Sequence, residues 1–170
     1  ISHLALAVIN LGDVVMAPSP TYPIHSYSVI IAGGEVLGIP MRGDTDFFEE
    51  MVSAYRRAKV KPKFLLLNLP HKPPTAGVDL GFFKRVVDFA RENRLWVIHD
   101  FAYADMVFDR YQAPSLLQVP GAKELAVEFF TLSKSYNMPG WRVGFCVGNP
   151  VIVGALAQLK SYLDYGIFQP

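Results

Sequence analysis

The chain has 170 residues, which is the size of one ordinary domain and enough to bury a hydrophobic core. Hydrophobic residues make up 51% of the sequence and charged residues only 18%, and 13 Gly and 13 Pro are scattered along it, which excludes a fibrous or disordered chain. A formal net charge of +1 gives no general attraction to nucleic acid or to an anionic membrane, so neither is expected as a partner.

Apolar spacing predicts amphipathic helices that alternate with short, continuously apolar strands. Strands that are apolar on both faces are typical of a mainly parallel sheet with helices on each side, so the predicted fold class is α/β. In chain order we expect a helix over 1–10, a strand over 14–17, a helix over 23–32, a strand over 35–39, a helix from a cap at Asp44 or Thr45 to about 57, a strand over 64–67, a helix over 80–94 and a strand over 95–98. Two more short apolar runs, over 127–132 and 143–147, precede a helix over 151–164.

The single cysteine, Cys146, cannot form an internal disulfide, which favours a reducing, cytoplasmic compartment. No apolar stretch is long enough to cross a bilayer, and no signal peptide is recognised. The sequence begins inside a predicted helix with Ile1 and closes without a terminating element. We therefore expect a single domain over residues 1–170 that belongs to a longer protein and is truncated at both ends.

Polar residues that directly follow an apolar strand are candidate site residues, because ligands bind beyond the carboxyl ends of parallel strands. Four segments fit this description: residues 17–23 around Tyr22, residues 68–75 with Lys72, residues 99–103 with Asp100, and residues 131–142 with Lys134. In the first, prolines stiffen the backbone around Tyr22, which suits a ring that stacks on a flat ligand or simply a Pro-rich turn. The second is an ordered, proline-rich loop that carries amide, imidazole and ammonium groups, or only a connection.

Asp100 ends an apolar strand, where a carboxylate is costly unless a cation or several hydrogen-bond donors meet it. Tyr103 lies three residues later, so a turn can bring its hydroxyl back to the same place. The alternative for Asp100 is a solvated helix or turn cap.

The segment around Lys134 combines an amine with hydroxyl groups and a guanidinium. Thr131, Ser133 and Arg142 together suit a doubly charged anion such as phosphate, because a guanidinium donates two parallel hydrogen bonds. Lys134 lies between apolar segments, where an amine that loses hydration becomes a nucleophile. A Ser-Lys pair is also found in serine hydrolases that use a lysine base, but that interpretation gives Arg142 and Asp100 no role.

Residues 133–145 read SKSYNMPGWRVGF, which closely resembles the lysine signature of the class I/II, fold-type I aminotransferases that use pyridoxal phosphate. The agreement continues upstream in DFAY at 100–103, in PSPTYP at 18–23 and in GDVV at 12–15, in the family's order and over nearly the whole chain. The resemblance implies the cofactor-binding large domain of a homodimeric transaminase.

The resemblance also implies roles for single residues. Lys134 would form the Schiff base with the cofactor aldehyde and later move the substrate's proton. Asp100 would pair with the pyridine nitrogen, Tyr103 would donate to the phenolic oxygen, and Tyr22 would stack on the ring. The phosphate would be held by Thr131, Ser133 and Arg142.

Lys72 departs from the family pattern, because members usually have Asn-Pro-Thr-Gly after the segment that corresponds to 68–71. That Asn also contacts the phenolic oxygen. A lysine at this position either donates a hydrogen bond in the same place and adds a second cation to the site, or swings out to solvent. In the family, a phosphate-binding loop precedes the segment where this chain starts, and the arginine for the substrate carboxylate follows the segment where it stops.

The resulting prediction is a pyridoxal-phosphate-dependent transaminase that moves an amino group between an L-amino acid and a 2-oxo acid. The activity of this fragment itself is expected to be impaired. The sequence most resembles enzymes that act on alanine, glutamate or diaminopimelate. The alternatives are a β-lyase or decarboxylase on the same scaffold, and a catalytically silent truncated domain.

Four further residues are interpreted as structural. Cys146 is expected to be a buried small side chain. His3 and His25 have no partner at metal-ligand spacing, so no metal site is expected. His99 either tunes its neighbour Asp100 or is a packed imidazole.

Overall fold

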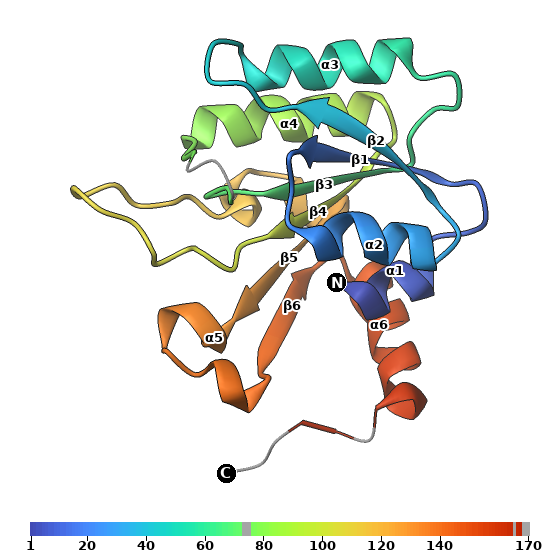
Figure 1. Cartoon of the computed structure of the whole chain (residues 1–170), viewed down its shortest axis with the longest axis vertical. Coiled ribbons are helices and arrows are strands. Elements are labelled where there is room, and N and C mark those ends of the chain that lie inside the picture. The colour runs from blue at the N-terminus through green and yellow to red at the C-terminus, as the bar shows by residue number, and fades with distance from the viewer. Residues whose placement is uncertain (73–75, 165, 168–170) are drawn as a thin grey trace.

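The computed structural model describes residues 1–72, 76–164 and 166–167. Its centre is a six-stranded sheet in the order β2-β1-β3-β4-β5-β6, in which neighbouring strands are parallel except β6, which runs antiparallel to β5. Helices cover both faces of this sheet (Figure 1). The predicted α/β class with a mainly parallel sheet is confirmed. Positions 73–75 of the predicted loop and 168–170 of the predicted open end lie outside the described residues.

The helices and strands follow the predicted order, with four short additions. The strands are β1 (Val14–Ser19), β2 (Glu35–Pro40), β3 (Phe64–Asn68), β4 (Trp96–Asp100), β5 (Ala126–Thr131) and β6 (Gly144–Gly148). The α-helices are α1 (Ser2–Val8), α2 (Pro23–Ile31), α3 (Phe47–Arg57), α4 (Leu80–Glu92), the single turn α5 (Leu132–Ser135) and α6 (Pro150–Leu163). The additions are the turn α5 and a set of 3-10 turns, η1 (Leu116–Gln118), η2 (Ala122–Glu124) and η3 (Pro139–Trp141), none of which the sequence analysis predicts.

The boundaries differ from the predicted ones where side chains cap helix ends. Neither Asp44 nor Thr45 caps α3; Asp46 does, because its carboxylate accepts a hydrogen bond from the Phe48 amide at 2.8 Å. Helix α4 stops at Glu92 rather than at residue 94. There the Asn93 side chain donates to the carbonyl of Phe89, and Arg94 takes a left-handed conformation with φ 54°.

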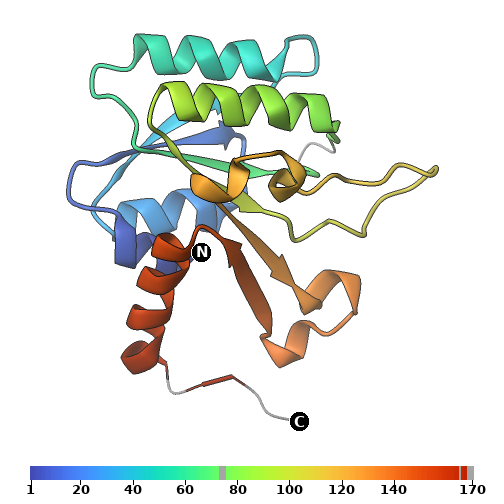
Figure 2. The same ribbon diagram turned by 180° about the vertical axis from the view of Figure 1, so that it is seen from behind.

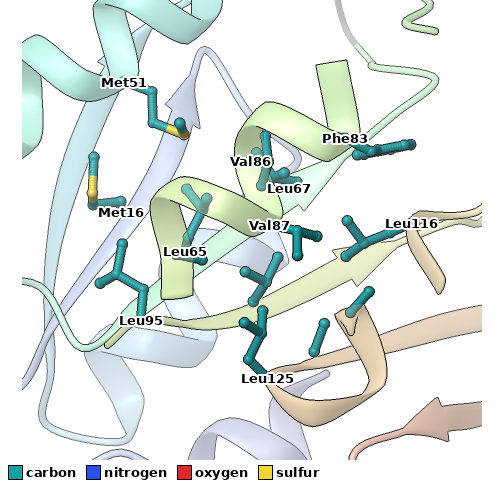
Figure 3. Packing of buried hydrophobic residues seen from close by; sticks show 14 of the residues in the cluster. Met16, Met51, Leu65, Leu67, Phe83, Val86, Val87, Leu95, Leu116 and Leu125 are labelled. Carbon is teal, nitrogen blue, oxygen red and sulfur yellow. The ribbon is translucent and has the colours of Figure 1, made fainter. Parts of the chain in front are cut away.

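Two separate hydrophobic clusters join the helices to the sheet, one on each face. The first packs α3 and α4 onto the sheet, and its members include Met51, Leu65, Phe83 and Val87, which Figure 3 labels. The second packs α1, α2 and α6 onto the opposite face, as the reverse view in Figure 2 shows. Because both faces are covered, the central strands β1, β3 and β4 are apolar on both sides, which explains their continuous apolar runs.

A buried polar group on the α4 face links β4, β5 and η1. His99 is fully buried and its Nδ1 lies 2.9 Å from Glu128 Oε2, while its Nε2 lies 2.9 Å from the Leu69 carbonyl. Glu128 also accepts hydrogen bonds from the Ser115 hydroxyl and the Leu116 amide, both at 2.9 Å. Of the two alternatives for His99, the packed imidazole is correct, because successive side chains of β4 point to opposite faces and this ring points away from Asp100.

Cys146, on β6, is half-buried rather than buried. The loss of hydration raises the pKa of its thiol to about 11. Within the described ranges, no helix has the length and apolar character required to traverse a bilayer.

The buried Glu128 is expected to be a large contributor to stability. Glu128→Ala leaves His99, Ser115 and the Leu116 amide without their acceptor, so we expect the free energy of unfolding to fall by about 3 kcal/mol. Urea denaturation measures this loss. The matched control is Glu92→Ala on the exposed surface of α4, with an expected change within about 0.5 kcal/mol. Equal effects of the two substitutions would contradict the assignment.

Candidate functional site

A cavity of about 430 Å³ opens at the carboxyl edge of the sheet. Its size is that of a small-molecule site. The register explains why it forms there: Asn68 on β3 is level with Asp100 on β4, and Asp100 is level with Phe129 on β5. The structure brings together in its wall all eight residues that the sequence analysis selects, namely Tyr22, Lys72, Asp100, Tyr103, Thr131, Ser133, Lys134 and Arg142.

Asp100 is the carboxylate of this cavity, and its side chain is only 14% exposed. Oδ2 lies 2.7 Å from His25 Nε2, and Oδ1 accepts a hydrogen bond from the Ala102 amide at 3.2 Å. Two donors therefore meet the buried carboxylate, as its burial requires. The solvated cap that was the alternative is not what the structure shows.

His25 is fully buried in the first turns of α2 and is held at both ring nitrogens. Its Nδ1 lies 2.9 Å from the Thr21 hydroxyl, and its Nε2 faces Asp100. When Asp100 is ionised, Nε2 carries the proton and donates to it. A neutral ring then accepts from Thr21 at Nδ1, so the hydroxyl fixes the orientation of the ring.

The expectation that His25 is an isolated structural residue is wrong. The sequence feature that could have identified this role is its spacing, because Thr21, Tyr22 and His25 lie within five residues at the start of a helix, where side chains three and four apart are neighbours. Its pairing with Asp100, 75 positions away, depends on the sheet order and is not readable from local pattern.

Asn68 is a second residue that the sequence analysis assigns no role. It is buried at the end of β3, and its Nδ2 donates to the backbone carbonyl of Asp100 at 2.9 Å. The side chain therefore ties together the ends of β3 and β4. The sequence feature that could have identified Asn68 is that two successive apolar runs of the chain are each followed by polar residues.

His71 fixes the loop that follows β3. It is buried, with Nδ1 2.9 Å from the Asn68 carbonyl and Nε2 3.0 Å from the Pro20 carbonyl. Burial lowers the pKa of His71 below the usual value of 6.5, although hydrogen bonds to both carbonyls oppose the shift. A neutral ring donates to only one of these two carbonyls.

Lys134 and Lys72 approach the same aromatic ring from different loops. Nζ of Lys134, on α5, lies 5.8 Å from the centroid of the Tyr103 ring, and Nζ of Lys72 lies 6.0 Å from it. Residue 134 is exposed, so the burial expected from its apolar flanks is wrong: β5 ends before it, β6 begins after it, and the turn α5 carries it to the rim. Lys72 does not leave the cavity, since it lines the wall.

The hydroxyl and guanidinium groups lie at the end of β5 and after η3. The Thr131 hydroxyl accepts a hydrogen bond from the Ser133 amide at 3.1 Å and so caps α5. Arg142, with a left-handed φ of 55°, donates from Nη1 to the Pro139 carbonyl at 2.8 Å, and this contact orients its guanidinium. Tyr22 is half exposed and meets the His25 ring edge-on at 5.7 Å.

The donor set of this cavity suits an anionic ligand rather than a metal. Three cationic side chains and five hydroxyl-bearing side chains line it together with one carboxylate. Among the residues that the structure describes, no three His, Cys, Asp or Glu side chains gather as a metal site would require.

The chain matches the model of the family "Aminotransferase class I and II" over residues 1–163. The chain belongs to this family. Its members are pyridoxal phosphate enzymes.

Relatives and solved structures agree with this assignment. The chain is 52% identical over 170 residues to glutamate-pyruvate aminotransferase AlaC of Escherichia coli, covering all of this chain and 41% of that protein. It is 41% identical over 170 residues to an LL-diaminopimelate aminotransferase of Natranaerobius thermophilus, covering all of this chain and 44% of that one. Among solved structures, a probable N-succinyldiaminopimelate aminotransferase of Thermus thermophilus superposes with a TM-score of 0.89 at 36% identity, over 98% of this chain and 45% of the other. The chain thus spans less than half the length of these aminotransferases.

The lowered pKa of His71 predicts a pH-dependent stability. The folded state binds a proton at His71 more weakly than the unfolded state does. The stability that this difference contributes is therefore fully present above the unfolded pKa of about 6.5 and is lost as the pH falls below it. We expect the urea midpoint to fall between about pH 7 and pH 5, and to fall less in His71→Asn. The control His3→Asn, at a more exposed histidine, should retain the full fall. The same pH dependence in His71→Asn and the parent would contradict the prediction.

Proposed function

We propose that this chain is the cofactor-binding part of a transaminase that moves an amino group between an L-amino acid and a 2-oxo acid. One observation carries the proposal: in a member of the aminotransferase family, an amine, a buried carboxylate with its own donors, and a guanidinium with two hydroxyls line a single cavity. These groups would serve the aldehyde, the ring nitrogen and the phosphate of pyridoxal phosphate.

The residues present fit the cofactor. The donor set offers cations and hydroxyls to a phosphate on the side of Thr131, Ser133 and Arg142, and a carboxylate to a protonated ring nitrogen on the side of Asp100. When bound, pyridoxal phosphate supplies an aldehyde that reacts with amines and a ring that withdraws electrons from the carbon attached to that nitrogen.

Asp100 would hold the proton on the ring nitrogen. His25 Nε2 and the Ala102 amide each lie within hydrogen-bond distance of one carboxylate oxygen, so the side chain is held in place from two sides. Since Thr21 fixes the His25 ring in turn, the carboxylate has a preset direction before any ligand binds.

Lys134 would anchor the cofactor through its aldehyde carbon. Once a substrate amine displaces it, the free Lys134 amine would take the proton from the substrate Cα and deliver it to that carbon of the cofactor. Its position on a short turn permits this movement. The Tyr103 hydroxyl would donate to the phenolic oxygen, and the half-exposed Tyr22 would cover one face of the ring. Arg142 keeps N–H groups for the phosphate beyond the one that it gives to Pro139.

The names of the relatives indicate which amino acids to propose as the amino donor. They include enzymes named for glutamate and pyruvate and for LL-diaminopimelate. On this basis we propose alanine, glutamate or diaminopimelate as the amino donor.

The remaining parts of the proposal concern the whole protein. We propose that residues 1–170 form one domain, the cofactor-binding large domain, and that the protein acts as a cytoplasmic homodimer. The exposure of Lys134 and Tyr22 supports a second subunit, because a further surface over the rim would exclude water from both.

Covalent capture of the cofactor tests the proposal directly. The purified chain is mixed with pyridoxal phosphate, reduced with borohydride and mapped by peptide mass spectrometry. We expect the main adduct on Lys134, because the anion-binding groups hold the aldehyde near this amine. Absence of an adduct, or an even spread over surface lysines, would favour the catalytically silent domain instead.

The carboxylate is tested separately by Asp100→Asn, which keeps the shape of the side chain and removes its charge. We expect the dissociation constant for pyridoxal phosphate, followed by absorbance titration, to rise roughly tenfold or more, equivalent to about 1.4 kcal/mol. Asp105→Asn is the matched control, because Asp105 is exposed in the loop after β4 and does not line the cavity. An unchanged dissociation constant in Asp100→Asn would refute the assigned role.

A further inference from the structure

The cavity contains a second lysine amine that the proposed mechanism does not use. Lys72 and Lys134 are 62 positions apart in the sequence, yet both line the same wall and both have Nζ within about 6 Å of the Tyr103 ring centroid. One enters from the loop after β3, the other from the turn after β5. A carbonyl ligand bound beside Tyr103 therefore has an amine on each of two loops.

The backbone before Lys72 is held firmly, although the side chain itself is exposed. His71 is buried, its ring nitrogens face the carbonyls of Asn68 and Pro20, and its amide donates to the Ala76 carbonyl at 2.9 Å. These contacts connect the loop to β3, to the end of β1 and back to itself. Lys72 thus starts from a fixed point at the rim and reaches over Tyr103.

Neither amine is engaged by an acid. Over residues 1–72, 76–164 and 166–167, no carboxylate lies within 4.0 Å of Nζ of Lys72 or of Lys134, and neither ammonium group makes a hydrogen bond. Asp100, which shares the cavity, is already met by His25 and the Ala102 amide. Both amines therefore remain available to a ligand.

We propose that Lys72 is a second covalent anchor for the aldehyde of pyridoxal phosphate, in competition with Lys134; this rests on the proposed function. The unprotonated amine adds to the aldehyde carbon, a C=N bond forms, and the carbonyl oxygen leaves as water with the two amine protons. No oxidant or reductant is required. The consequence is that removing Lys134 redirects the capture of the aldehyde to Lys72 instead of abolishing it.

The experiment compares adduct positions in the parent chain, Lys134→Ala, Lys72→Arg and the double variant. Each protein is mixed with one equivalent of pyridoxal phosphate, reduced with borohydride and digested, and the adducts are quantified by mass spectrometry. The exposed Lys84 and Lys123 report the background of random labelling. Urea denaturation verifies that every variant is folded, as expected for exposed positions.

In Lys134→Ala we expect the adduct at Lys72 to exceed that at Lys84 and Lys123 by roughly tenfold or more, because the cavity concentrates the aldehyde beside Tyr103. In the double variant the adduct should return to background. Arginine keeps the positive charge at position 72 but does not condense with the aldehyde under these conditions. Loss of the adduct in the double variant therefore identifies a covalent anchor at Lys72 and not an electrostatic effect of its charge.

Two other outcomes are distinguishable. If the parent is labelled at Lys134 while Lys134→Ala shows only background at Lys72, the second anchor is overturned and the proposed function stands. If neither lysine of the parent exceeds Lys84 and Lys123, the cofactor site itself is refuted and the second anchor with it.

Discussion

Parallel pairing of β1, β3, β4 and β5 is the constraint on which the site depends. It brings the ends of these strands to one edge, so that Asn68, Asp100 and the start of α5 meet although they are far apart in sequence. Side-chain hydrogen bonds, rather than the backbone hydrogen bonds between strands, then fix this edge. Asn68 donates to the Asp100 carbonyl, and His25 pairs with the Asp100 carboxylate. The cavity is thus a product of strand order first and of loop sequence second.

Strand β4 carries two polar residues in succession that serve opposite faces. His99 points into the core beneath α4 and bonds Glu128, whereas Asp100 points to α2 and bonds His25. The strand end is therefore fixed from both sides by charged or polar contacts with little exposure. A carboxylate supported in this way keeps its direction without help from a ligand, which is the condition for binding a flat, charged ring in one orientation.

Much of this arrangement could be predicted from the sequence, because buried parallel strands and amphipathic helices have clear periodicities. The fold class, the order of the elements and the four polar segments at strand ends all follow from such local patterns. The contacts of His25 and Asn68 could not be predicted, since they depend on which strands are neighbours and on side-chain direction. Three nearby side chains could cap α3, and it is Asp46, not Asp44 or Thr45, that accepts the hydrogen bond from the free amide. The exposure of Lys134 arises from a turn too short to show a periodic signal.

Cys146 has a consequence for the chemistry of the whole chain. Thiols are the strongest competitors of amines for electrophiles in most proteins, but a thiol with a pKa of about 11 is almost entirely protonated near neutrality. It is also the only sulfhydryl of the sequence. An aldehyde that enters this protein thus reacts with nitrogen nucleophiles, essentially without competition from the thiol.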